Sequence, residues 1–88
     1  MQDIRENLRK ASKQVSEKCF EEAVQTLEQV VIDSKNQEYV GGKFCAYKHL
    51  GDLYCKMVLV ASNPIYRDGM KIRSVVFEKL MVAYSHLI

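Results

Sequence analysis

Apolar residues recur with the period of an α-helix in four successive segments. These segments cover approximately residues 3–15, 19–33, 38–60 and 68–87. In the first of them, Ile4, Leu8 and Ala11 fall at spacings of four and three, which places them on one face of a helix. Alternation of apolar and polar residues, which is typical of a strand, does not occur along the chain. The pattern therefore predicts an all-α protein.

Short polar links separate the predicted helices. The first link is expected at residues 16–18, and residues 34–37 are expected to be a turn or the frayed end of the second helix. Gly41 and Gly42 follow residues 34–37 and predict either the start of the third helix or a kink in it. Each glycine inside a helix costs about 1 kcal/mol relative to alanine, so a regular helix is expected to begin near this pair.

The start of the fourth helix has two candidate positions. Asn63 followed by Pro64 is typical of an N-cap and the first helical residue. Asp68 and Gly69 favour a later start, which would leave residues 58–67 as an irregular link. Four helices joined in this way form two antiparallel helical hairpins, and such hairpins stack because neither can bury both faces alone. The prediction is one domain over residues 1–88.

Composition and charge exclude several classes of protein. The 13 basic and 11 acidic side chains leave a formal charge of +2, which is too small to indicate nucleic acid or an anionic membrane by itself. The longest apolar run is residues 57–61, whereas a membrane-spanning helix needs about 20 residues. Residues 1–15 contain no apolar block of the kind found in secretory signals. We therefore expect no contact with a membrane.

Cysteine usage indicates the compartment. The three cysteines, Cys19, Cys45 and Cys55, are an odd number without short spacings, whereas small secreted domains normally carry an even set. We interpret them as reduced, mostly buried thiols, which predicts a cytoplasmic or nuclear protein.

Catalytic and metal-binding patterns are weak. Cys45 and His49 stand four residues apart, a spacing that can hold a metal, but strong zinc sites bring four ligands in paired spacings. His49 and His86 are the only histidines, and both fall inside predicted helices. No glycine-rich phosphate loop is present. The prediction is a protein that is not an enzyme and has no cofactor or metal.

One stretch of the third predicted helix has a specific pattern. Tyr47, Leu50, Gly51 and Tyr54 are spaced as aromatic-x-x-Leu-Gly-x-x-Tyr. This pattern resembles the first helix of a tetratricopeptide repeat, in which the glycine lets a neighbouring helix approach closely. The resemblance implies a superhelix of stacked hairpins.

The preceding predicted helix resembles the second helix of such a repeat. Phe20, Ala23 and Leu27 place a small residue between larger ones, where two helices would cross. Ala23 and Tyr47 are 24 residues apart, about six more than the distance between the corresponding positions of the basic repeat of roughly 34 residues. This spacing is similar to the longer repeats of scaffold proteins of the LGN and kinesin light chain type.

The resemblance implies a function in protein binding. We expect an adaptor or scaffold that binds a peptide or helix of a partner protein on the inner surface of the superhelix. The residues expected there are Lys48, Asp52, Tyr39 and Lys43. The negative charge of Asp52 would repel a terminal carboxylate, so a basic or helical segment fits better.

Two other functions stay open. The apolar C-terminal helix predicts an association surface at Leu80, Tyr84 and Leu87, which would suit a homo-oligomer or a homotypic assembly module of death-fold type. The weaker alternative is a nucleic-acid-binding domain. It would use a basic stripe made of Arg5, Arg9, Lys10 and Lys13.

Overall fold

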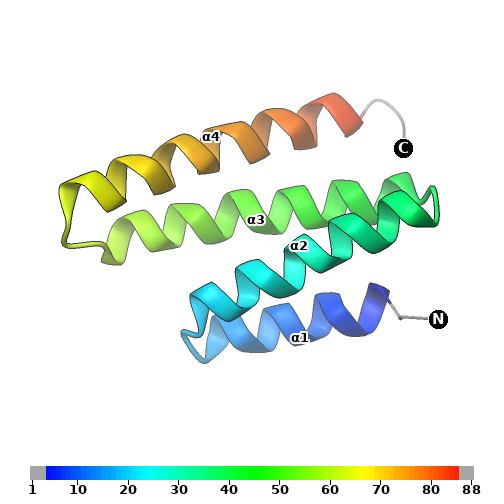
Figure 1. Ribbon diagram of the computed structural model, residues 1–88, viewed down its shortest axis with the longest axis horizontal. Coiled ribbons are helices and arrows are strands. Elements are labelled where there is room, and N and C mark those ends of the chain that lie inside the picture. The colour runs from blue at the N-terminus through cyan, green and yellow to red at the C-terminus, as the bar shows by residue number, and fades with distance from the viewer. Residues whose placement is uncertain (1–3, 86–88) are drawn as a thin grey trace.

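Four helices in sequence order make up the computed structural model, which describes residues 4–85. The helices are α1 (Ile4–Ser16), α2 (Phe20–Asn36), α3 (Val40–Val60) and α4 (Pro64–Ser85). Consecutive helices run in opposite directions, so that α1 with α2 and α3 with α4 form two hairpins (Figure 1). The molecule measures 38 × 27 × 16 Å along its principal axes. The predicted all-α fold is confirmed.

The first two turns share one geometry. Lys18 ends the first turn with a left-handed φ of 62°, and Glu38 does the same in the second with a φ of 53°. After Lys18, the Cys19 N–H donates to the carbonyl of Gln14 at 2.8 Å. This bond closes the helix end in a Schellman motif, in which glycine usually takes the left-handed position. The predicted first link at residues 16–18 is close to the observed turn.

Of the two structures expected for residues 34–37, a turn and a helix end, the structure has the helix end, because α2 continues to Asn36. Ser34 is fully buried where α2 meets the start of α3. A Cβ atom added at Gly42 would collide with the Oγ of Ser34. Gly42 therefore permits the close approach of the two helices, and the glycine pair begins α3 as expected.

The later start predicted for the fourth helix, at residue 68, is wrong. The Oδ1 of Asn63 accepts hydrogen bonds from the N–H groups of Ile65 at 2.9 Å and Tyr66 at 3.2 Å. Asn63 is therefore the N-cap and Pro64 the first helical residue, the arrangement that the Asn-Pro pair favours. The link between α3 and α4 shortens to residues 61–63, and the expected irregular segment 58–67 is helical at both ends.

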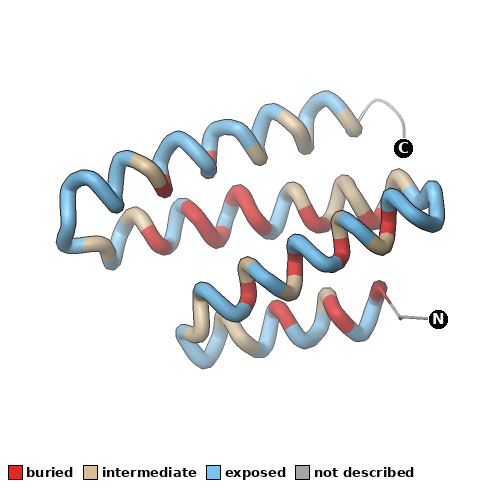
Figure 2. Tube along the Cα trace, viewed as in Figure 1, coloured by how far each residue is buried: buried red, intermediate tan, exposed pale blue. Residues whose placement is uncertain are grey.

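The core is centred on α3, which carries more buried positions than any other described helix (Figure 2). Those positions are Gly42, Ala46, Leu50, Gly51, Leu53, Tyr54 and Met57. Along α4, by contrast, only Met70 and Ser74 are buried. Both α2 and α4 pack on α3, but within residues 4–85 the backbones of α2 and α4 do not approach each other. One consequence is a valley between α2 and α4, with α3 beneath it.

The α3–α4 contact depends on small and hydroxylated residues. The Ser74 Oγ donates to the carbonyl of Gly51 at 3.1 Å and lies 2.8 Å from the sulfur of Cys55. Cys55 is exposed and the other two cysteines are only partly buried, so the expectation of mostly buried thiols is wrong. A Cβ atom at Gly51 would lie 3.3 Å from the Cγ of Glu78, so this glycine marks a close approach, as the sequence pattern suggested. None of the described helices is both long and apolar enough to cross a bilayer.

Candidate protein-binding surfaces

Two of the predicted inner-surface residues, Lys48 and Asp52, lie exposed on one side of α3. Asp52 lines a groove of about 410 Å³ between α3 and α1. The apolar residues that line this groove are Ala11, Val15, Phe20, Leu27 and Leu53. The polar residues that line it are Ser12, Ser16, Lys18, His49, Asp52 and Lys56. This α1–α3 groove is one surface on which a partner segment could lie.

The other two predicted residues lie elsewhere. The Nζ of Lys43 is 5.4 Å from the centre of the Tyr84 ring, a cation–π contact on the side of α3 that faces α4. Tyr39 precedes α3, and its ring lies beside Gly41 and Gly42. The structure therefore does not bring the four predicted residues together on one surface.

The valley between α2 and α4 forms a second groove, of about 710 Å³, which we call the α2–α4 groove. One wall is the α2 side, with Glu21, Val24, Gln25 and Glu28, and the opposite wall is α4, with Tyr66, Met70, Arg73, Val76 and Phe77. Tyr54 and Met57 of α3 line it from below. The volume lies within the range of about 300–1,000 Å³ that is typical of ligand sites.

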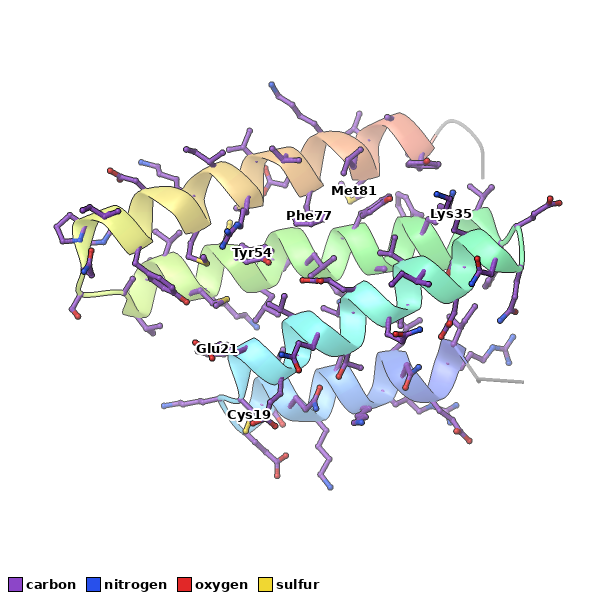
Figure 3. All side chains as sticks on the ribbon, viewed as in Figure 1. Cys19, Glu21, Lys35, Tyr54, Phe77 and Met81 are labelled. Carbon is purple, nitrogen blue, oxygen red and sulfur yellow. The ribbon has the colours of Figure 1, made fainter. Side chains whose placement is uncertain are left out.

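Aromatic rings pack against one another at the base of this groove. In Figure 3, Phe77 reaches from α4 toward Tyr54 on α3, and Glu21 projects from the first turn of α2. The rings of Tyr54 and Phe77 are stacked, with centroids 5.6 Å apart and planes 8° from parallel. A second ring of α3, that of Tyr47, lies 5.9 Å from Phe77, which ties the two helices together next to the groove.

Charge is unevenly distributed around the floor. Burial raises the pKa of the Tyr54 hydroxyl, the Glu28 carboxylate raises it further, and Arg73 opposes them. Tyr54 therefore lies between an acidic wall on α2 and a basic residue on α4. Glu21 and Glu28 are seven residues apart, so two turns or about 10 Å of α2 separate the two carboxylates along the groove. A ligand with basic residues along one edge would meet both.

The predicted association residues are only partly available at the surface. Tyr84 packs its ring 5.5 Å from that of Tyr47, and Leu80 is half-buried. Leu87 lies outside the described residues. The exposed apolar side chains of α4 are instead Ile65, Tyr66, Ile72, Val75, Val76 and Val82. The sequence analysis did not single out this face, although the helical spacing of Ile65, Ile72 and Val75 could have revealed it.

The basic stripe predicted on α1 lies at the surface of the protein. Arg5, Arg9, Lys10 and Lys13 are all exposed on α1. Glu22 and Asp33 of α2 line a shallow depression together with Lys10, so the stripe borders acidic residues on one side. Among residues 4–85, no group of three histidine, cysteine, aspartate or glutamate side chains could hold a metal ion.

Comparison of the chain with protein-family models, with curated proteins and with solved structures found no match. The resemblance to tetratricopeptide repeats therefore depends on the sequence pattern of α3 and part of α2 alone. In the structure, Leu50 and Gly51 of that pattern are buried, and Tyr54 makes the ring contact with Phe77. These are packing roles that many helical folds require.

Proposed function

We propose that this chain is a protein-interaction module that binds an amphipathic helix of a partner protein in the α2–α4 groove. The observation that carries the proposal is that α2 and α4 both pack on α3 while their backbones do not approach each other. The groove between them is lined by the apolar side chains of Tyr54 and Met57 from α3 and of Phe77 from α4. Helix-in-groove recognition uses this arrangement, with anchors at i, i+3 or i+4, and i+7.

The side chains of the groove suit an adaptable contact. Met57 and Met70 belong to its lining, and methionine adjusts its shape to different apolar anchors. Three buried anchors would gain roughly 5–9 kcal/mol from apolar burial, of which association entropy removes a large part. We therefore expect dissociation constants of about 1–100 µM, as for a reversible adaptor.

Charge narrows the class of partner. Glu21 and Glu28 line the α2 wall, and Arg73 lies on the α4 wall. A helix with basic residues along one edge would complement the α2 wall, whereas an acidic helix would be repelled there. This preference agrees with the basic or helical segment that the sequence suggested for an adaptor.

A displayed library of overlapping segments from the proteome of the source organism tests the proposal. We expect the native chain to select segments with apolar residues at helical spacing and basic residues on one edge. The variant carrying Glu21→Lys and Glu28→Lys should lose these segments. The matched control carries Glu6→Lys and Glu17→Lys, which change the charge equally at exposed positions of α1 and its turn. Equal selection by both variants would contradict the proposal.

The α1–α3 groove is the competing surface within the same class of function. Asp52→Lys reverses the charge in that groove and leaves the α2–α4 groove untouched. If Asp52→Lys abolishes binding and the Glu21 and Glu28 variant does not, the partner lies on the surface that contains Lys48 and Asp52. That result would refute the α2–α4 groove as the site.

A further inference from the structure

The outward face of α4 is more apolar than a solvent-exposed helix face normally is. Ile65 is 84% exposed, Ile72 66% and Val82 54%. Val75 and Val76 complete the same face, which lies opposite the buried Met70 and Ser74. Exposed apolar residues gathered on one face of a helix in this way indicate an interaction surface, which we call the α4 stripe.

The stripe also contains two opposite charges in defined places. Successive residues of a helix are about 100° apart, so Asp68 and Lys79 fall on the same outward face as Ile72. Asp68 lies toward the start of the stripe and Lys79 toward its end. They are separated by 11 residues, or about 16 Å along the helix axis.

This order of residues is symmetric about a point midway between Arg73 and Ser74. Asp68 and Lys79 are equally far from that point on either side, and Ile72 and Val75 flank it closely. Ile65 and Val82 are also equally distant from it, at the two ends of the stripe. The stripe is therefore complementary to a copy of itself that runs in the opposite direction.

We propose that two copies of this chain form a homodimer by antiparallel pairing of their α4 helices through this stripe. A two-fold axis through the midpoint would place each Asp68 against Lys79 of the second copy, and each Ile72 against Val75 of the second copy. This is the self-complementary contact that a symmetric dimer requires. Parallel pairing would instead set Asp68 against Asp68 and Lys79 against Lys79, which is repulsive.

The size of the stripe sets the strength of the contact. A helix of 22 residues is about 33 Å long, and one helix face buries an area at the lower end of stable interfaces. We therefore expect a reversible dimer with a dissociation constant of about 1–100 µM. The stripe shares Val76 with the α4 wall of the α2–α4 groove but contains none of the residues of the floor or the acidic wall, and the pairing does not depend on the proposed function. A dimer would present two such grooves and could bind a partner bivalently.

Sedimentation of the full chain over roughly 1–300 µM tests the pairing. We expect the native chain to dimerise and the single variants Asp68→Lys and Lys79→Asp each to weaken the dimer roughly tenfold, because each turns two attractive pairs into repulsive ones. The double variant, Asp68→Lys with Lys79→Asp, should restore the native dissociation constant. Control charge reversals at exposed positions outside the stripe, Glu17→Lys and Lys10→Asp, should leave it unchanged.

Three results would overturn the dimer. These are a native chain that stays monomeric throughout the concentration range, single variants that dimerise like the native chain, and a double variant that stays as weak as the single ones. Circular dichroism at 222 nm monitors folding, which these exposed substitutions should preserve. A monomeric chain that still selects helical segments through Glu21 and Glu28 would refute the dimer and leave the proposed function intact.

Discussion

Replacing Gly42 by alanine tests how closely α2 and α3 pack. The new methyl group would collide with the Oγ of Ser34 and would lie 3.0 Å from the Cβ of Ser34 and from the Cδ2 of Tyr39. Rotation of the Ser34 side chain can move its hydroxyl but not its Cβ, which is fixed to the backbone of α2. The two helices must therefore shift apart.

The cost can be worked out from two opposing effects. Overpacking of a buried site costs about 1–3 kcal/mol. Alanine in place of glycine returns up to about 1 kcal/mol of helix propensity. We expect Gly42→Ala to lower the free energy of unfolding by about 1–2 kcal/mol, which is a fall in melting temperature of roughly 4–15 °C for a domain of this size.

Gly69→Ala is the matched control, because a Cβ added at Gly69 meets nothing within 4 Å. It should gain the helix propensity without a collision and raise the free energy of unfolding by about 0.5–1 kcal/mol. Urea unfolding followed by circular dichroism at 222 nm measures both variants. Adding Ser34→Ala to Gly42→Ala should recover part of the loss, because it removes the colliding hydroxyl. A Gly42→Ala variant as stable as Gly69→Ala would refute the close α2–α3 approach.

Three further perturbations follow from the same contacts. Phe77→Ala should cost about 2–3 kcal/mol of unfolding free energy, because the half-buried ring contacts those of Tyr54 and Tyr47. Thermal unfolding measures this loss against Leu59→Ala, a truncation at an exposed position outside both grooves and the α4 stripe. Asn63→Ala should lower the free energy of unfolding by about 1 kcal/mol, because it removes the N-cap of α4, whereas Asn63→Asp should keep most of the native stability. Equal stability of the two variants would contradict the cap. Burial raises the pKa of Tyr54, so its hydroxyl stays protonated longer in the folded state and stability should fall as pH rises above about 10. Urea unfolding at rising pH should show a smaller fall for Tyr54→Phe.

The local sequence was sufficient to predict the helices and not their exact ends. Four helical periods and the Asn63-Pro64 pair are local signals, and both appear in the structure. The end of α2 depends on a tertiary contact, since Ser34 continues the helix where Gly42 of α3 leaves room for it. The polar residues 34–37 do not by themselves indicate that α2 contacts another helix there.

The orientation of α4 was harder to predict because that helix has two apolar stripes. Hydropathy favours the stripe of Ile72 and Val75, but the structure turns Ser74 and Phe77 toward α3. The hydrogen bond from Ser74 to the carbonyl of Gly51 and the ring contacts of Phe77 explain that choice, and neither contact is visible in the periodicity of one helix.

The candidate site was predicted only in part for a similar reason. Lys48 and Asp52 were expected on one surface, and both are exposed on α3. Lys43 was expected with them but lies over the Tyr84 ring, because α4 covers that side of α3. The α2–α4 groove exists because two helices that are not consecutive in the chain both pack on α3 without close backbone contact between them. No pattern within one segment of the sequence predicts such an arrangement.

The most direct test of the helix-binding groove uses the methionine methyl groups in an NMR titration. Met57 and Met70 line the groove, whereas Met81 does not. Addition of a segment selected by the native chain should shift the methyl signals of Met57 and Met70 and leave that of Met81 in place. Unchanged Met57 and Met70 signals, together with shifts of amide signals from Ser12 and Asp52 in the α1–α3 groove, would contradict it.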